Sequence, residues 1–109
     1  MDYFEINGSK ELNGIVKVSG AKNAVLPLMA AAILNKGSLK ISNVPKLSDS
    51  LTMSRLLEEM GAEVNFESDN SITINSSKLD TPFAAYDLVK TMRASFYVLG
   101  PLLARFGKA

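Results

Sequence analysis

The spacing of hydrophobic and polar residues changes along the chain, and each spacing predicts a different element. Residues 25–34 form an almost unbroken apolar run. With the two polar residues before it, this run predicts a helix over residues 22–34 that is apolar nearly all round and therefore buried on more than one side. Pro27 lies near the start of this helix, where its missing N–H costs little.

A second helix is predicted by apolar residues that recur at positions 53, 56, 57 and 60. This spacing places them on one face, so the helix is expected to be amphipathic. Ser48 or Asp49 is expected to cap its start, because a short oxygen-bearing side chain can accept a hydrogen bond from the first free amides. Gly61 is expected to end the helix.

Alternating apolar and polar residues predict strands. Residues 64–66 and 72–74 alternate on either side of a turn that contains Asp69 and Asn70, which predicts an antiparallel hairpin with one solvent-exposed face. β-rich stretches at residues 3–6, 15–18 and 39–44 predict three further strands. The predicted order from residue 15 to residue 74 is β-α-β-α-β-β.

The pattern divides the chain into three parts. Residues 1–20 hold the N-terminal strands, residues 21–85 form one β-α-β-α-β-β unit, and residues 86–109 begin a second unit with a helix near 91–106 that Gly100-Pro101 kinks. Lys22 and Arg93 each stand where an apolar helix begins, which indicates a weak internal repeat. Because the second unit has only its first helix, we expect the chain to be the N-terminal piece of a larger protein.

Composition narrows the function. The 109 residues have a net charge of +1, which gives no strong field for nucleic acid or an anionic membrane. There is no cysteine and no histidine, so acid–base chemistry within these residues is left to Asp, Glu, Lys or Tyr. No secretory signal, membrane-spanning run, metal-ligand cluster or nucleotide-binding glycine loop is present. We therefore expect a cytoplasmic protein with no metal or organic cofactor.

The junction at residues 19–24, Ser-Gly-Ala-Lys-Asn-Ala, is the strongest candidate for chemistry. The free N–H groups of a helix start, with Lys22 beside them, suit a phosphate or carboxylate. Other interpretations stay open: Lys22 can be a solvated lysine, Asn23 a helix cap, Arg93 an ion-pair partner of Asp87, and Tyr97 a core aromatic. Lys46, Lys90 and Arg105 are interpreted as solvated or helix-end charges.

Residues 19–24 resemble the opening of the enolpyruvyltransferases. Three later blocks agree with that family in the same order, namely residues 43–47, 86–95 and 99–107. Among these enzymes the likeness is greatest to those that act on UDP-N-acetylglucosamine, a likeness that residues 86–95 favour. The resemblance implies a mixed α/β (α+β) fold of repeated β-α-β-α-β-β units in an inside-out barrel, with about one and a half units in this chain.

The resemblance also implies roles for single residues. Lys22 and Asn23 would bind phosphoenolpyruvate, and Asn23, Arg93 and Tyr97 would bind UDP-N-acetylglucosamine. Family members often have tryptophan where this chain has Tyr97, which puts in doubt any contact that needs an indole N–H. The family's proton donor, a cysteine or an aspartate, would lie beyond Ala109, so no catalytic residue is assigned here and the chain alone is predicted to be inactive.

The whole enzyme is expected to be a monomer that transfers the enolpyruvyl group of phosphoenolpyruvate to the 3-hydroxyl of the sugar, the first committed step of peptidoglycan synthesis. Three alternatives remain. One is a transferase like enolpyruvylshikimate-phosphate synthase, and another is a non-catalytic anion- or nucleotide-binding module. The third, an RNA 3′-terminal phosphate cyclase, needs histidine chemistry that this chain lacks.

Overall fold

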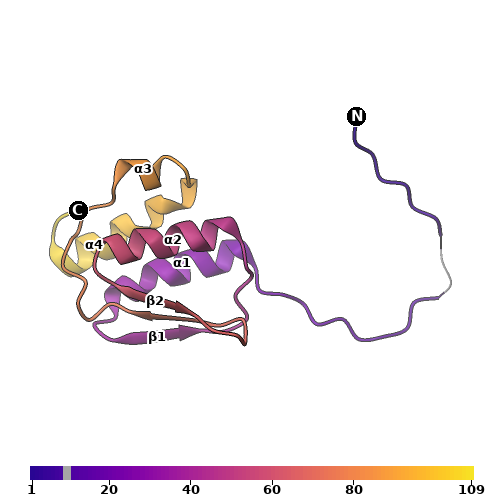
Figure 1. The fold of residues 1–109 in the computed structure, drawn as a ribbon, viewed down its shortest axis with the longest axis horizontal. Coiled ribbons are helices and arrows are strands. Elements are labelled where there is room, and N and C mark those ends of the chain that lie inside the picture. Colours follow the sequence, from indigo (N-terminus) through magenta and orange to yellow (C-terminus); the bar gives the residue numbers. More distant parts are fainter. Residues whose placement is uncertain (9–10) are drawn as a thin grey trace.

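The computed structural model describes residues 1–8 and 11–109, and its folded part is a small sheet covered on one face by helices (Figure 1). This mixed architecture confirms the expected fold class. In chain order the helices and strands are α1 (Lys22–Ala31), the 3₁₀ helix η1 (Ala32–Leu34), β1 (Ser38–Ile41), α2 (Ser48–Glu59), β2 (Glu63–Phe66), β3 (Ile72–Asn75), α3 (Tyr86–Val89), the 3₁₀ helix η2 (Arg93–Val98) and α4 (Leu99–Phe106).

The sheet has the order β1-β3-β2, and both pairings are antiparallel. Ile72 and Ile74 of the central strand are fully buried, while Thr73 between them lies on the more open face. The predicted hairpin is therefore confirmed, and its turn uses Asn70 in a left-handed conformation (φ 57°).

The third strand is shorter than the sequence predicts. β1 ends at Ile41, because Asn43 adopts a left-handed conformation (φ 56°) that breaks the extended chain. Val44 lies outside the strand. Its side chain is buried and its N–H donates to the Asn70 carbonyl at 2.7 Å.

Helix α1 occupies the centre of the folded part, in contact with α2, β1 and η2. Its inner face buries Val25, Leu26, Met29 and Ala30, so burial against several elements is confirmed, although Leu28 on the other face is 49% exposed. Pro27 lies in the second turn rather than the first. Because proline has no N–H, it cannot make the helical hydrogen bond to the Asn23 carbonyl.

Helix α2 has its predicted extent and amphipathic face, but the predicted cap is wrong. Leu47 is the N-cap residue, and neither Ser48 nor Asp49 caps the helix with its side chain. The Ser50 hydroxyl accepts a hydrogen bond from the Leu47 N–H at 3.3 Å and donates to the Leu47 carbonyl at 2.8 Å. Gly61 follows the helix with a positive φ of 104°, as expected of a stop residue.

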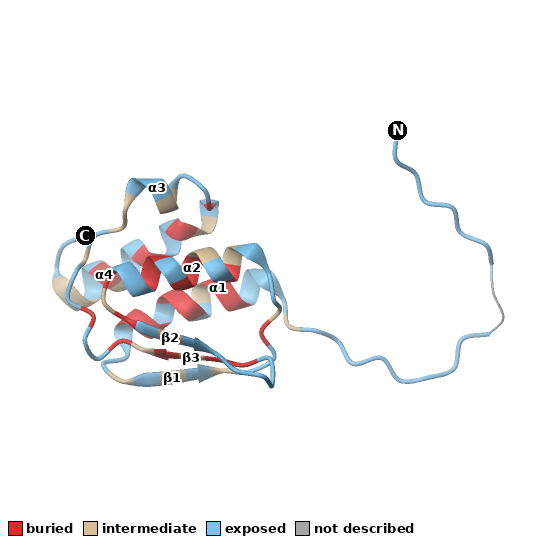
Figure 2. Ribbon diagram, in the orientation of Figure 1, coloured by how far each residue is buried: buried red, intermediate tan, exposed pale blue. Residues whose placement is uncertain are grey.

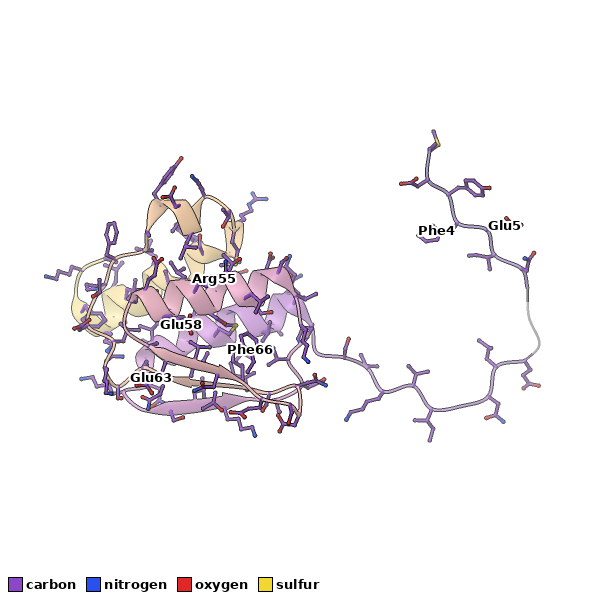
Figure 3. All side chains as sticks on the ribbon, in the orientation of Figure 1. Phe4, Glu5, Arg55, Glu58, Glu63 and Phe66 are labelled. Atoms are coloured by element: carbon purple, nitrogen blue, oxygen red, sulfur yellow. The ribbon has the colours of Figure 1, made fainter. Side chains whose placement is uncertain are left out.

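The strands predicted at residues 3–6 and 15–18 do not form in this structure. Residues 1–8 and 11–19 run away from the folded part as an extended arm, and their side chains are exposed (Figures 1 and 2). Figure 3 shows Phe4 and Glu5 far from every helix and strand. A strand needs a partner for its N–H and C=O groups, and no neighbour supplies one to these segments. Ser9 and Lys10 lie outside the described residues.

Gly20 marks the point where the arm joins the folded part. A Cβ atom there would lie 1.8 Å from the Asn43 carbonyl oxygen, so no larger residue fits without moving the backbone. The close packing of these two segments sets the direction in which the chain enters α1.

The helix predicted near residues 91–106 is two elements, η2 and α4. The change falls at Val98-Leu99, so Gly100 and Pro101 lie in the first turn of α4. Arg105 lies in the last turn of α4, as expected of a helix-end charge, but it is partly buried rather than fully solvated. Its guanidinium donates to the carbonyls of Ile33 (2.9 Å), Ser76 (2.9 Å) and Leu79 (3.2 Å), which ties α4 to the end of η1 and to the loop after β3.

Candidate functional site

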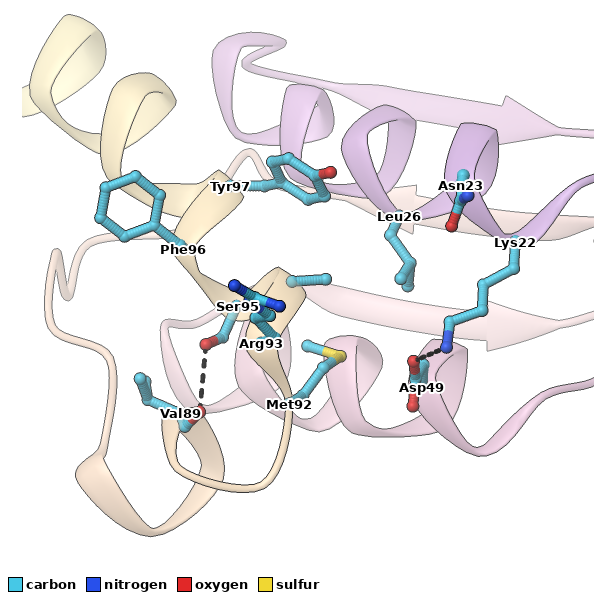
Figure 4. A pocket seen from close by; sticks show the side chains of 11 residues that line it. Lys22, Asn23, Leu26, Asp49, Val89, Met92, Arg93, Ser95, Phe96 and Tyr97 are labelled. Carbon is cyan, nitrogen blue, oxygen red and sulfur yellow. Dashed lines mark hydrogen bonds and ion pairs between the residues drawn. The ribbon is translucent and has the colours of Figure 1, made fainter.

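A cavity of about 700 Å³ lies between the start of α1, the start of α2 and η2 (Figure 4). Lys22 and Asn23 come from α1, Asp49 from α2, and Arg93 and Tyr97 from η2. The remaining residues that line it are mostly apolar: Leu26, Val89, Met92, Ala94, Ser95 and Phe96.

The α1 wall of the cavity presents the open end of a helix. The Ala24 and Val25 N–H groups both donate to the Ala21 carbonyl at 3.1 Å, so the amides of Lys22 and Asn23 precede the first hydrogen bonds of the helix. Ala21 is the N-cap residue and no side chain caps the helix, which disfavours the interpretation of Asn23 as a cap. This end can therefore offer N–H donors, an ammonium and an amide side chain to an anion.

Lys22 is exposed, as in the solvated interpretation, with 50% of its side-chain surface open to solvent, but its Nζ also forms an ion pair with Asp49 Oδ2 (Figure 4). Asp49 lies in the first turn of α2, where the helix dipole favours a negative charge. The sequence pattern predicts only a helix cap at Asp49. The two residues are far apart in the sequence, so no local pattern could have revealed the pair.

The η2 wall carries Arg93 and Tyr97. The η2 helix is anchored at its start by Met92, whose side chain is buried, and by the Ser95 hydroxyl, which donates to the Val89 carbonyl at 3.2 Å. Tyr97 is 48% exposed and lines the cavity, so it is not a core aromatic. The alternative interpretation, an ion pair of Arg93 with Asp87, is not found; Asp87 pairs with Lys90 at 2.6 Å.

The structure thus brings the four residues predicted from the sequence, Lys22, Asn23, Arg93 and Tyr97, around one cavity. Two cations face a hollow whose floor includes Leu26 and Met92. Such a site suits an anionic ligand with a small organic part.

Two other properties of the described part of the chain bear on the chemistry. Residues 1–8 and 11–109 contain no group of three or more acidic, His or Cys residues that could hold a metal ion. No helix among these residues is long and apolar enough to cross a membrane.

The pattern of helices and strands is that of an enolpyruvyl transferase. The family model described as EPSP synthase (3-phosphoshikimate 1-carboxyvinyltransferase) matches residues 6–109. The chain therefore belongs to this family. Its structure is similar to the crystal structure of the enolpyruvyl transferase NikO from Streptomyces tendae, with a TM-score of 0.77 and 28% identity over 92% of this chain and 23% of that one.

Curated relatives are more similar still. The UDP-N-acetylglucosamine 1-carboxyvinyltransferase of Campylobacter hominis is 53% identical over 98% of this chain, and the protein of the same name from Dichelobacter nodosus is 51% identical over all of it. The chain covers 26% of each of these relatives, so it spans about a quarter of their length.

Proposed function

We propose that the natural protein that carries this sequence is a UDP-N-acetylglucosamine 1-carboxyvinyltransferase. It transfers the enolpyruvyl group of phosphoenolpyruvate to the 3-hydroxyl of UDP-N-acetylglucosamine and releases phosphate. The observation that carries the proposal is the shared cavity, in which Lys22 and Asn23 on α1 face Arg93 and Tyr97 on η2. The names of the similar relatives support the same activity.

In this proposal the α1 wall binds phosphoenolpyruvate. Lys22 and Asn23 hold its phosphate through the ammonium, the amide side chain and the free N–H groups of the helix start. A lysine is suited to this task because its compact charge on a flexible stem can follow a phosphate that later leaves. Binding of phosphate there also neutralises the positive end of α1.

The η2 wall, in the same proposal, binds the sugar nucleotide, to which Asn23 also contributes. Arg93 presents a planar set of donors that matches carboxylate or phosphate oxygens. Tyr97 offers an aromatic face to the sugar. With both substrates in one cavity, the two cations offset the repulsion between two anions and orient the reacting atoms.

The reaction is proposed to proceed by addition and elimination. The 3-hydroxyl oxygen bonds to C2 of phosphoenolpyruvate, the hydroxyl loses its proton and C3 gains one, which gives a tetrahedral ketal. Loss of a proton from C3 and cleavage of the C2–O bond to phosphate then yield the enol ether and inorganic phosphate. No described residue is assigned as proton donor or base, so these groups are proposed to lie outside the 109 residues.

The proposal includes the setting of the enzyme. It acts in the cytoplasm as a monomer, needs no cofactor, and catalyses the first committed step of peptidoglycan synthesis, on which cell-wall growth, cell shape and division depend. Residues 1–20, 21–85 and 86–109 are proposed to belong to different structural units of the whole enzyme, with the first strands packing on its other domain.

Phosphate release in the presence of both substrates tests the function. In the natural protein, Lys22→Ala is expected to lower turnover by about 10²–10³-fold, since a cation that stabilises the leaving phosphate is lost. Lys36→Ala, which removes an exposed lysine outside the cavity, is the matched control and should turn over normally. Near-normal turnover of Lys22→Ala would remove Lys22 from its role, and binding of the substrates without any phosphate release would indicate a non-catalytic module.

A second candidate is a transferase that uses shikimate 3-phosphate, because the matching family model carries the name EPSP synthase. The two candidates share a donor and differ in acceptor. Incubation with phosphoenolpyruvate and an equal mixture of both acceptors separates them. We expect enolpyruvyl transfer to UDP-N-acetylglucosamine alone, and transfer to shikimate 3-phosphate would favour the second candidate.

A further inference from the structure

We propose that Asp49 is a positioning residue that holds Lys22 in the cavity before the substrate binds and competes with the substrate phosphate for it. This inference rests on the proposed function and adds to it a residue with no assigned role. Asp49 does not react in this scheme. It acts through Lys22.

The first support is the place of the ion pair. The Lys22–Asp49 pair lies in the cavity wall, and both residues line the cavity. Of the four ion pairs among residues 1–8 and 11–109, it has the least exposed carboxylate. The Asp49 side chain is 28% exposed, whereas the acidic partners of the other three pairs are 60–85% exposed. An ion pair that is partly shielded from water is stronger than an open surface pair.

The second support comes from the two helix starts. Helix α1 has no acidic residue in its first turn and no side-chain cap, and it begins with a lysine. Its positive end is therefore left with an added positive charge. Asp49 belongs to the first turn of α2, where the dipole of that helix stabilises a carboxylate, and the ion pair brings this negative charge to Lys22. Without a ligand, Asp49 supplies the negative charge that a phosphate would supply.

This arrangement has two consequences for binding. Asp49 keeps the Lys22 ammonium at the cavity wall, so the flexible side chain is already ordered when phosphoenolpyruvate arrives. The same carboxylate repels the incoming phosphate, and the phosphate must displace it from Lys22. Both effects weaken ground-state binding of phosphoenolpyruvate. The charge that organises the site therefore also limits how tightly the phosphate is held, which helps the product phosphate to leave.

Calorimetric binding of inorganic phosphate, and separately of phosphoenolpyruvate, to the natural protein tests this inference. Two neutral variants, Asp49→Asn and Asp49→Ser, are expected to bind phosphate about tenfold more tightly at low salt, since a nearby repulsive charge is gone. The gain should shrink in about 0.5 M salt, where charges are screened. The KM for phosphoenolpyruvate should fall, while kcat should not rise.

Two controls separate this role from a structural one. Asp49→Glu keeps the charge and should bind phosphate within about twofold of the wild type. Asp69→Asn removes an exposed, paired carboxylate outside the cavity and should leave phosphate affinity unchanged. Melting temperatures show that each variant is folded. Having two neutral variants keeps the test open if one of them fails to fold.

Unchanged or weaker phosphate binding in the folded neutral variants would overturn the inference, and so would an equal gain in Asp69→Asn. If the wild type binds and Lys22→Ala does not, but the Asp49 variants match the wild type, only this inference fails. If the wild-type protein binds neither phosphate nor phosphoenolpyruvate, the proposed function fails with it.

Discussion

The two walls of the cavity are built differently. The α1 wall is a regular helix that packs against the sheet and α2 and buries Val25, Leu26, Met29 and Ala30. The η2 wall is a 3₁₀ helix in which only Ser95 and Val98 are buried. A 3₁₀ helix has poorer hydrogen-bond geometry than an α-helix, so the η2 wall depends more on its anchors. Lys22 therefore lies on the wall with more buried side chains and Arg93 on the wall with fewer.

The largest effect is expected from the core of the α1 wall. Met29 is fully buried, so Met29→Ala should lower the free energy of unfolding by about 3 kcal/mol, through lost apolar burial and the cavity that remains. Leu28→Ala on the open face of the same helix is the matched control, with an expected loss of less than about 1 kcal/mol. Urea unfolding of the natural protein measures both. Equal losses of unfolding free energy in the two variants would contradict the view that the buried face of α1 holds this wall in place.

Arg105, which anchors α4, the helix that directly follows η2, should be the next most sensitive point. Arg105→Ala leaves three backbone carbonyls without their charged donor, and we expect a loss of about 2 kcal/mol. Amide exchange should show faster opening in α4 and η2 than in β3. Arg55→Ala, which removes an exposed arginine from α2 (Figure 3), is the control and should change neither. Faster exchange spread evenly over the sheet would contradict a local anchor.

A smaller effect, on substrate binding, is expected when Arg93 on the η2 wall is substituted. Arg93→Lys keeps the charge but loses the planar pair of donors, so the KM for UDP-N-acetylglucosamine should rise about tenfold. The KM for phosphoenolpyruvate should stay within about twofold, because Lys22 and Asn23 on α1 are assigned to it. Steady-state kinetics with each substrate varied in turn gives both values. A rise confined to the KM for phosphoenolpyruvate would indicate that the η2 wall binds phosphoenolpyruvate and would contradict the assignment.

Asp69 outside both walls should give the smallest effect. Its hydrogen bond from the Ser71 hydroxyl, followed by that from Lys40, lowers the pKa of Asp69 below 3.8. A lowered pKa in the folded state adds stability above the unfolded pKa, and this stability is lost as the pH falls below about 4 through the folded pKa. Asp69→Asn should therefore lower the melting temperature slightly at pH 7 and by less at pH 2. A larger loss at pH 2 would contradict this assignment.

The sequence predicted those elements whose signals are local. The apolar run after Asn23 gave α1, the helical spacing of Met53 to Met60 gave α2, and the alternation around Asp69-Asn70 gave the hairpin. The cap of α2 was wrong because Ser50, inside the helix, takes the Leu47 amide. The strands at 3–6 and 15–18 were wrong for this structure because β-rich composition forms a strand only beside a partner.

The candidate site was predictable in its residues and not in its contacts. Lys22, Asn23, Arg93 and Tyr97 follow from the resemblance, and the structure groups them around one cavity. Two sets of contacts join residues that are distant in sequence. One is the Lys22–Asp49 ion pair, and the other is the set of hydrogen bonds from Arg105 to three backbone carbonyls. Packing alone decides such pairs, so a single sequence carries no periodic signal for them.

The central claim is that the α1 and η2 walls bind the two substrates in one cavity. A crystal structure of the natural protein with phosphoenolpyruvate and UDP-N-acetylglucosamine bound tests it most directly. The account predicts a phosphate oxygen of phosphoenolpyruvate within hydrogen-bond distance of Lys22 Nζ, about 2.7–3.2 Å, and the sugar nucleotide against Arg93 and Tyr97. Substrates bound away from these residues, or on opposite sides of the protein, would contradict it.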